Sequence, residues 1–391
     1  MSEFGVFVEK IESANKHPNA DRLDLCVLEG KFFQFVTGKD NYKKGDFVLY
    51  FPVDSLIPTE HHALLGVEGK LSGSQKQRVK TVRLRGEFSQ GLVAPVSILE
   101  SLNWRDFANS KGFGSVVDAL DLHAFAEACI SLGFDLSELF GVVKYEPPVR
   151  TSGGPNLSGR NTDLPEGIKK YDIESAQRYK HIIEQLSESN TLIQVTEKLE
   201  GTHATFKKIA NEDKFNICSR TRTWERMFNE DGEPMKNTYL DVFDSDKRIK
   251  DLLLLVEEDY KPQFFCALRG EIIGESIQGN IYQLKGNHFF LFDIMVDGQY
   301  LSVDKIKKYE SMINFVPELF VGTVNDYLFF ELKENIVQAA NGKISLNCPT
   351  KGKHLREGIV VKPFEQEIYD SKLGRVILKV RDLEYLENTG N

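Results

Sequence analysis

The stretch Val195-Thr-Glu-Lys-Leu-Glu-Gly-Thr-His-Ala-Thr-Phe206 decides the fold of this chain. The apolar run that ends at Val195 predicts one strand, and the composition of Ala204 to Phe206 predicts another. Gly201 lies between them and lets the backbone turn or approach a ligand closely. Lys198 therefore follows the first strand directly, in a position where a lysine amine can act as a nucleophile.

A lysine nucleophile must first lose its proton, and this requires a special environment. The free side chain has a pKa of about 10.4, so it is charged at neutral pH. Neighbouring cations or burial lower the pKa of a lysine. Because a lysine and a glycine three residues apart are common, a solvent-exposed lysine on a hairpin is the alternative interpretation of this motif alone.

Five segments that follow Lys198 extend the pattern. They are residues 215–220, a strand ending on Arg220; 268–274, with Glu271 between glycines; 288–294, an aromatic strand with Phe292; 356–363, with Glu357 and Lys362; and 376–381, with Lys379 and Arg381 on one face of a strand. Each segment alone also fits an ordinary strand with acids at its edge, aromatic residues in the core or bases in solvent. The combination of all these segments in this order is much less likely to arise by chance than any one segment alone.

In this order, the segments resemble the motifs of the covalent nucleotidyltransferase superfamily of polynucleotide ligases and mRNA capping enzymes. The stretch Thr196-Glu-Lys-Leu-Glu-Gly-Thr202 is most similar to RNA ligases of the nick-sealing type. The resemblance covers residues 170–382 and much of residues 1–100, because a smaller group of RNA ligases carries an OB-like module first. Only ten residues follow Arg381, whereas ATP-dependent DNA ligases and capping enzymes usually place an OB domain there.

The resemblance implies an ATP-dependent RNA ligase that acts in RNA repair or nick sealing. Lys198 would attack the α-phosphate of ATP to form lysyl-AMP, AMP would pass to an RNA 5′-phosphate, and a 3′-hydroxyl would attack that end. Such transfer depends mainly on positioning and charge neutralisation. The alternatives are a DNA ligase, a GTP-using mRNA capping guanylyltransferase, and a non-catalytic RNA-binding protein with a ligase-like fold.

The resemblance also implies a nucleotide site around Lys198. The residues expected to bind ATP are Glu197 by the adenine, Phe292 stacked on the base, Arg220 and Glu271 by the ribose or metal, and Lys362, Lys379 and Arg381 on phosphate oxygens. Lys362, Lys379 and Arg381 would also favour loss of the lysine proton by repulsion of like charges.

Glu200, Glu271 and Glu357 are the residues expected to hold Mg²⁺ or Mn²⁺, because carboxylate oxygens suit such ions. Three positions depart from the family pattern. Glu200 stands where many sites have Asp, and its extra methylene changes the metal geometry. His203 replaces a smaller polar residue. Arg381 stands where a second lysine is common, and phosphate binding is expected to persist because arginine is always charged.

Short strands separated by turns fill residues 1–100 and predict a small β-barrel. The stretch His17-Pro-Asn-Ala-Asp-Arg-Leu-Asp-Leu-Cys26 resembles the opening of the OB-type tRNA-binding modules of some aminoacyl-tRNA synthetases. This resemblance favours an RNA platform. The alternative is that Pro18 and Asn19 simply make a good turn.

A second candidate for RNA binding is the segment 70–85, which contains six basic residues and no acid. The candidate RNA-binding residues there are Lys76, Arg78, Lys80, Arg83 and Arg85. A basic strand on a barrel can follow a phosphate backbone. The alternative is an ordinary solvated edge strand, which basic residues also protect from pairing.

The composition restricts the class of protein. The net charge of −9 excludes a global attraction to nucleic acid, so an RNA partner must meet a local basic surface. Five cysteines without a C-x-x-C pair argue against a disulfide framework or a zinc ribbon. They indicate a reducing compartment, cytoplasmic or nuclear. We expect no membrane segment and no signal peptide, and we expect a monomer.

The predicted fold class is α+β, with an N-terminal OB-like β-barrel before a nucleotidyltransferase (ATP-grasp-like ligase) core of antiparallel sheets and flanking helices. The predicted domains are an RNA-binding barrel at 1–100, a mainly helical connecting segment at 101–146, a flexible linker at 147–167 and a catalytic domain at 168–391. Helices are expected over 97–107, 116–132, 135–141 and 171–186.

Overall fold

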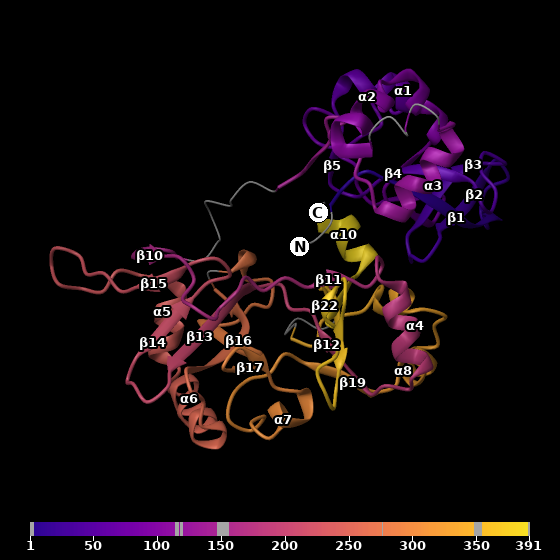
Figure 1. Cartoon of the computed structure of the whole chain (residues 1–391). Coiled ribbons are helices and arrows are strands. Elements are labelled where there is room, and N and C mark those ends of the chain that lie inside the picture. The colour runs from indigo at the N-terminus through magenta and orange to yellow at the C-terminus, as the bar shows by residue number, and fades with distance from the viewer. Residues whose placement is uncertain are drawn as a thin grey trace. The chain divides into compact units, whose positions relative to one another are not determined.

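The computed structural model describes residues 4–113, 117, 120–146, 156–275, 277–347 and 354–389. The chain forms two compact units (Figure 1). The first consists of Met1–Pro148, Gln177–His181 and Leu386–Asn391, and the second of Val149–Ala176 and Ile182–Tyr385. Each unit has hydrophobic clusters of its own. None of the described helices combines the length and apolarity that a membrane crossing requires.

A five-stranded antiparallel sheet of OB type organises the first unit, in the order β3-β2-β1-β4-β8. Its strands are β1 Phe7–Lys16, β2 Leu23–Leu28, β3 Gln34–Gly38, β4 Phe47–Phe51 and β8 Leu92–Pro95. A bulge between Ile11 and Ser13 bends β1, which pairs with both β2 and β4. Alternate residues of β2 are buried, as expected for a strand with one face on the core. The predicted OB-like barrel is confirmed.

Shorter elements complete the first unit. They are β5 Ser55–Leu56, η1 Thr59–His61, α1 His62–Leu65, β6 Val82–Leu84, β7 Glu87–Ser89, η2 Val96–Ser101, α2 Trp104–Ala108, η3 Asn109–Phe113, α3 Leu122–Leu132 and β9 Val143–Lys144. The helical part packs on the barrel, since Trp104 and Phe125 share one buried cluster with Val8 and Leu49 of the barrel strands. The helix expected over 135–141 is wrong: these residues form turns, in which the N–H of Phe140 donates to Leu136 and that of Gly141 to Glu138, and no regular helical series develops.

A seven-stranded sheet forms one half of the second unit, in the order β10-β15-β14-β13-β16-β17-β18. Its strands are β10 Arg160–Thr162, β13 Thr202–Ile209, β14 Phe215–Cys218, β15 Thr223–Glu225, β16 Phe265–Gly274, β17 Asn287–Val296 and β18 Gln299–Tyr300. α5 (Thr238–Ser245) and α6 (Lys247–Tyr260) pack on it. Apolar residues of both helices, such as Phe243 and Leu252, join Phe206 and Leu268 in one buried cluster.

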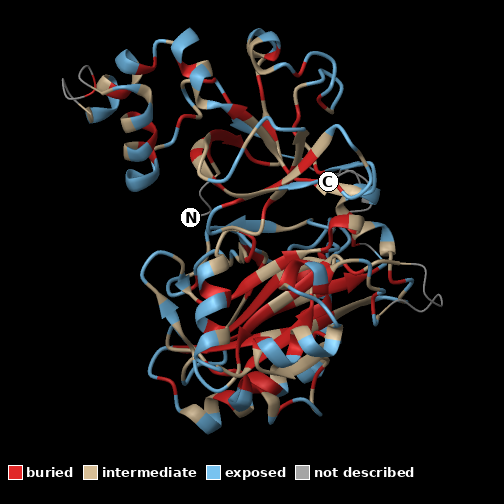
Figure 2. Ribbon diagram, turned by 90° about the vertical axis from the view of Figure 1, so that its right-hand side faces the viewer, coloured by how far each residue is buried: buried red, intermediate tan, exposed pale blue. Residues whose placement is uncertain are grey.

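A five-stranded sheet forms the other half, in the order β11-β23-β20-β12-β19. Its strands are β11 Glu174–Ser175, β12 Ile193–Glu197, β19 Glu318–Gly322, β20 Gly358–Pro363 and β23 Leu378–Arg381. Further elements are α4 Lys180–Glu188, η5 Gln278–Asn280, α7 Val303–Lys307, α8 Val324–Glu331, α9 Ile336–Ala340, β21 Tyr369–Asp370, β22 Gly374–Arg375 and α10 Leu383–Thr389. Buried residues concentrate on the strands of this unit (Figure 2), which confirms the predicted core of antiparallel sheets.

The chain before α4 differs from the prediction. A helix was expected over 171–186, but the described helix begins only at Lys180. The residues before it are extended because β11 pairs with β23 in parallel, with Ser175 opposite Lys379. Of the predicted linker, residues 147–155 lie outside the described part, and Arg160–Thr162 form β10, which pairs with β15.

Candidate active site

The candidate site lies where the chain leaves β12 and enters β13. Lys198 follows β12 directly, and its backbone N–H donates a hydrogen bond of 3.0 Å to the carbonyl oxygen of Gly358 on β20. Two residues later, the N–H of Glu200 donates to the hydroxyl of Tyr282 at 2.7 Å. The lysine is therefore fixed at the junction of the two sheets of the second unit.

Gly201 is required here by close packing. A Cβ atom at this position would lie 2.5 Å from the carbonyl oxygen of Ile272 and 2.6 Å from Cγ of Glu271. Real Cβ atoms do not approach other atoms so closely, so only glycine lets β13 begin against β16. This packing brings Glu271 beside the loop that carries Lys198.

Lys198 takes part in a short ion pair. Its Nζ lies 2.5 Å from Oε2 of Glu357, whose other oxygen is 3.5 Å from Nε of Arg381. The side chain of Glu357 is 11% exposed and that of Lys198 is 24% exposed, so water screens this pair only in part. The candidate nucleophile thus has a proton acceptor at hydrogen-bond distance.

Lys379 brings another positive charge to the site. Burial, and then the nearby charges of Lys198 and Arg381, lower its pKa to about 8. Lys379 lies on β23, opposite Val360 of β20. The grouped cations repel one another, and an anion such as a polyphosphate would relieve that repulsion.

Glu271 is a half-buried carboxyl group in the same place. Burial raises its pKa to about 8; the carboxylate of Glu357 adds to the rise, while Lys198 and Arg220 oppose it. A divalent cation beside Glu271 and Glu357 would offset both the burial and the mutual repulsion. Their oxygen donors therefore suit Mg²⁺ or Mn²⁺.

Glu200 does not join this pair. Its carboxylate accepts a hydrogen bond from the hydroxyl of Tyr385. Among the residues that the structure describes, no three His, Cys, Asp or Glu side chains gather as a metal-binding group. The three carboxylates predicted as ligands are thus not brought together as one set: Glu271 and Glu357 lie near each other, whereas Glu200 is bound to Tyr385.

Aromatic rings line the side of the cavity where the base was expected. The ring of Tyr171 stacks on His203 with centroids 5.2 Å apart and lies 5.1 Å from the ring of Phe292. Burial and the nearby charge of Arg269 lower the pKa of His203 to about 3, so its ring is neutral. Sequence analysis missed Tyr171, because it assigned the residue to a helix.

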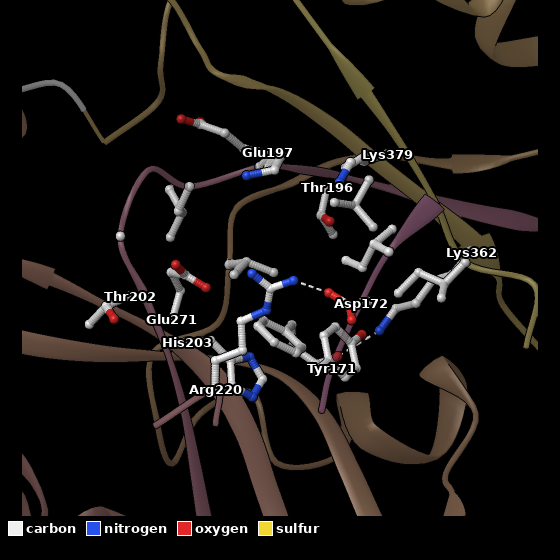
Figure 3. A pocket seen from close by; sticks show the side chains of 18 residues that line it. Tyr171, Asp172, Thr196, Glu197, Thr202, His203, Arg220, Glu271, Lys362 and Lys379 are labelled. Atoms are coloured by element: carbon white, nitrogen blue, oxygen red, sulfur yellow. Dashed lines mark hydrogen bonds and ion pairs between the residues drawn. The ribbon is translucent and has the colours of Figure 1, made fainter. Parts of the chain in front are cut away.

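Arg220 also has a partner that the sequence did not reveal. It lies in the turn after β14 and forms an ion pair with Asp172, which precedes β11 of the other sheet (Figure 3). Both side chains are about half exposed. The pair connects the two sheets of the second unit across one side of the cavity.

Two predicted nucleotide ligands are bound within the protein. The amine of Lys362 donates to the carbonyl oxygen of Phe292 at 2.6 Å and to the buried carboxylate of Asp293 at 3.1 Å. The carboxylate of Glu197 accepts hydrogen bonds from the hydroxyl of Ser345 at 2.5 Å and the N–H of Leu346 at 2.8 Å. Both side chains line the cavity, but their charged groups already have partners.

The cavity has a volume of about 390 Å³. Seven predicted residues line it: Glu197, Lys198, Arg220, Glu271, Phe292, Lys362 and Lys379. Glu357 reaches it through its ion pair with Lys198, and Arg381 is linked to it through Glu357. Their roles in catalysis and binding stay predictions, but the structure brings these side chains, which are far apart in the sequence, to one place.

The predicted RNA-binding residues lie in the first unit and differ in their surroundings. Arg78 is buried; it pairs with Asp54 at 2.6 Å and lies over the ring of Tyr145. Arg83 pairs with Glu387 and covers the ring of Phe88. The pKa of Lys80 is lowered by burial and by Arg78, whereas Lys76 and Arg85 are exposed.

Two curated relatives match part of the chain, and both are phenylalanine–tRNA ligase beta subunits. The protein of Bdellovibrio bacteriovorus is 28% identical over 185 residues, and that of Bacillus licheniformis is 26% identical over 204 residues. These matches cover 43% and 48% of this chain but only 21% and 22% of the relatives. The chain therefore spans about a fifth of their length.

Solved structures of the Naegleria gruberi RNA ligase are similar over the whole chain. A mutant with ATP and Mn is 26% identical with a TM-score of 0.69, covering 100% of both chains. The structure with PPi is 26% identical with a TM-score of 0.67, covering 99% of each chain. Sequence profiles agree: that of RNA ligase matches residues 191–381, and that of an OB-fold domain matches residues 6–96. These findings support an RNA ligase core at residues 191–381, with an OB-fold domain ahead of it at residues 6–96.

Proposed function

We propose that this RNA ligase joins a 3′-hydroxyl end to a 5′-phosphate end through a lysyl-AMP intermediate on Lys198, and that it works in RNA repair or nick sealing. One observation carries the proposal. Lys198 lies in the cavity at the junction of two sheets, ion-paired to Glu357 and next to Lys379 and Arg381. ATP is the nucleotide, as in the similar structure with ATP and Mn.

The first step forms the lysyl-AMP. The Nζ of Lys198 attacks the α-phosphorus of ATP, so that a P–N bond forms and the P–O bond to pyrophosphate breaks. The departing proton of Nζ has a nearby acceptor in Glu357, 2.5 Å away. Lys379 and Arg381 stabilise the charge that develops on the phosphate oxygens.

The next two steps use the same cations. An oxygen of the RNA 5′-phosphate attacks the phosphorus of lysyl-AMP, which releases Lys198 and forms an AMP-capped RNA end. The 3′-hydroxyl then attacks the RNA phosphate, so that a phosphodiester forms and AMP leaves. Each transfer depends on holding the reacting groups in line and neutralising phosphate charge.

Glu271 and Glu357 are the residues that would hold Mg²⁺ or Mn²⁺. The ion would supply positive charge to the phosphate oxygens. On the other side of the cavity, the exposed face of Phe292 would stack on adenine and Arg220 would contact the ribose or phosphates. Arg220 must then exchange its contact with Asp172 for the nucleotide.

The remaining assignments are part of this proposal. Residues 1–100 are the RNA-binding barrel, residues 101–146 a mainly helical connecting segment, residues 147–167 the linker and residues 168–391 the catalytic domain. The substrate is RNA with broken ends or a nicked duplex, and the enzyme acts as a monomer. The four cysteines that the structure describes are buried and unpaired, which suits a reducing compartment, cytoplasmic or nuclear.

The test is labelling with ATP, GTP or NAD that carries the label in the transferable nucleotide, with Mn²⁺ or Mg²⁺, followed by denaturing electrophoresis. The wild type should retain label from ATP, and Lys198→Ala should retain none. Lys214→Ala, at an exposed position of the same unit, is the matched control. Label from GTP alone would indicate a capping enzyme. Absence of label from folded protein that has been freed of bound AMP would overturn the proposal.

A further inference from the structure

Glu357, the ion-pair partner of the nucleophile, lies between β20 and two short segments that are hydrogen-bonded to each other. β20 begins one residue after it. The residues before it, 354–356, pair with residues 343–345; the N–H of Ser345, for example, donates to the carbonyl oxygen of His354 at 3.0 Å. We call residues 343–345 and 354–356 the paired segments. The position of the Glu357 carboxylate depends on how these segments are held.

Ser345 connects the paired segments to the strand that carries the nucleophile. Its hydroxyl donates to the carboxylate of Glu197 at 2.5 Å, and the N–H of Leu346 donates to the same carboxylate at 2.8 Å. Glu197 ends β12, directly before Lys198, and its carboxylate points away from the other side chains labelled in Figure 3. Glu197 is 1% and Ser345 5% exposed, so little water competes for this contact.

A second buried carboxylate holds the paired segments from the other side. Asp382 directly follows Arg381, and its N–H donates to the carbonyl oxygen of Glu357 at 3.0 Å. Burial raises the pKa of Asp382, whereas nearby backbone N–H groups, among them those of Gly342 and Lys343, oppose the rise. These two N–H groups lie at the start of the paired segments, so Asp382 connects the segments to the end of β23.

The two buried carboxylates belong to chain neighbours of the two cations that contact Glu357. Glu197 precedes Lys198 in the chain, and its counterpart Asp382 follows Arg381. Both cations form ion pairs with Glu357. A buried carboxylate costs free energy unless it is hydrogen-bonded, so apolar side chains would hold a turn at lower cost. Hydrogen bonds add direction, which a group that accepts a proton from Lys198 requires.

We propose that Ser345 is a positioning residue for the first step of the reaction. By binding Glu197 it holds the paired segments against β12, and so keeps the carboxylate of Glu357 at the amine of Lys198. Asp382 holds the same segments from β23 and acts in the same way. Neither Ser345 nor Asp382 is among the described residues that line the cavity, so both affect the rate of transfer and leave the binding of ATP unchanged.

This role of Ser345 rests on the proposed formation of lysyl-AMP at Lys198. A wild type that takes up no label from ATP would therefore overturn both. If the wild type is labelled, and Ser345→Ala is labelled equally fast at every ATP concentration, only the role of Ser345 is overturned. The two failures are thus distinguishable.

The test is the single-turnover time course of labelling of the full chain with ATP and Mn²⁺, at a series of ATP concentrations. Its amplitude gives the fraction of folded enzyme, whereas its rate constant describes only the molecules that react. Ser345→Ala should lower the rate constant at saturating ATP about tenfold, which is part of the roughly 10²–10⁴-fold that a positioned proton acceptor contributes. The ATP concentration at half-maximal rate should stay within about twofold of the wild type.

Three further variants complete the test. Ser345→Thr keeps the hydroxyl and should restore the rate constant to within about threefold of the wild type. Asp382→Asn should lower it about fivefold at an unchanged half-maximal ATP concentration, because the amide brings a donor to the N–H groups of Gly342 and Lys343. Ser302→Ala is the control and should change nothing, since this buried hydroxyl has no hydrogen-bond partner in the described part of the chain.

Two other patterns in Ser345→Ala would overturn the positioning role. A higher half-maximal ATP concentration at an unchanged rate constant would show that Ser345 orients Glu197 toward the base, as a loss of preference for ATP over GTP would also show. A lower amplitude at an unchanged rate constant would show that the hydroxyl acts only on folding. A lower rate constant in Ser345→Ala and Asp382→Asn, restored in Ser345→Thr, would support the role.

Discussion

At the scale of single residues, the protonation of Lys379 makes the positive charge of the site depend on pH. Its pKa of about 8 lies below the ordinary 10.5, because of burial first and then Lys198 and Arg381. The side chain is therefore charged at pH 7 and loses its charge as the pH rises through 8. Phosphate binding should weaken over the same range.

We predict that the KM for ATP in the labelling step rises about three- to tenfold between pH 7.5 and 9, as expected for the loss of one phosphate-binding charge. Lys379→Arg should flatten this rise, because the guanidinium stays protonated. The measurement is the initial rate of lysine labelling against ATP concentration at each pH. A wild-type KM that does not change over this range would contradict the assignment.

Single residues also show which parts of the site can be predicted from the sequence and which cannot. Lys198, Glu271 and Lys379 were predicted because the segments that contain them, in their order along the chain, resemble the motifs of the nucleotidyltransferase superfamily. Tyr171 and Asp172 were missed, because neither belongs to a spaced motif and their partners, His203 and Arg220, come from distant strands. Such contacts depend on tertiary packing, and no local pattern encodes them.

At the scale of elements, a buried charge cluster joins β17, β20 and β22. Asp293 of β17 is fully buried and binds Lys362 of β20 at 3.1 Å and Arg375 of β22 at 2.7 Å. The hydroxyl of Tyr171 donates to the same carboxylate at 2.5 Å. Burial alone would raise the pKa of Asp293, but these two cations hold it well below its ordinary range.

Asp293→Asn should lower the free energy of unfolding at pH 7 by about 3–5 kcal/mol, because it neutralises the carboxylate that pairs with the buried Lys362 and one of the two carboxylates that pair with the buried Arg375. The contribution of a depressed carboxyl is complete above the unfolded pKa of about 3.9 and is lost as the pH falls further. The difference between variant and wild type should therefore shrink at pH 3. Urea unfolding at both pH values measures this.

Asp213→Asn, at an exposed position of the same unit, is the control and should change stability by less than about 0.5 kcal/mol. A loss that is equally large at pH 3 and pH 7 would show that the aspartate acts through packing. The stabilising role that we assign to the charge of Asp293 would then be wrong.

Strands were predicted better than helices, for a physical reason. Alternating or continuous apolar runs identified β12, β16, β17 and β20, because those strands are buried. The region before α4 has helical periodicity, but pairing between β11 and β23 outweighs the local preference. The basic strand expected within residues 70–85 is also short: β6 ends at Leu84, and Arg85 takes a turn conformation.

At the scale of the whole molecule, the two units have separate hydrophobic clusters. The candidate nucleotide cavity is lined entirely by residues of the second unit. A ligand stabilises only the cooperative unit that binds it. The response to ATP should therefore be confined to one unfolding transition.

We predict two transitions in calorimetry, of which only one moves when ATP and Mn²⁺ are added to Lys198→Ala, a variant that binds without forming lysyl-AMP. At a hundred times the Kd, the stabilisation is about 2.7 kcal/mol. This corresponds to a rise in Tm of roughly 5–10 °C for a domain of this size. GTP under the same conditions is the control. A shift of both transitions would contradict the assignment of the cavity to one unit.

The contact of Gly201 has a consequence for the evolution of such ligases. Its nearest neighbour is the backbone oxygen of Ile272, which every amino acid carries. No substitution at position 272 can make room for a side chain at position 201. No second substitution can therefore compensate for the loss of this glycine. Covariation between the sequences of the two strands would not reveal this contact, although the placement of Lys198 depends on it.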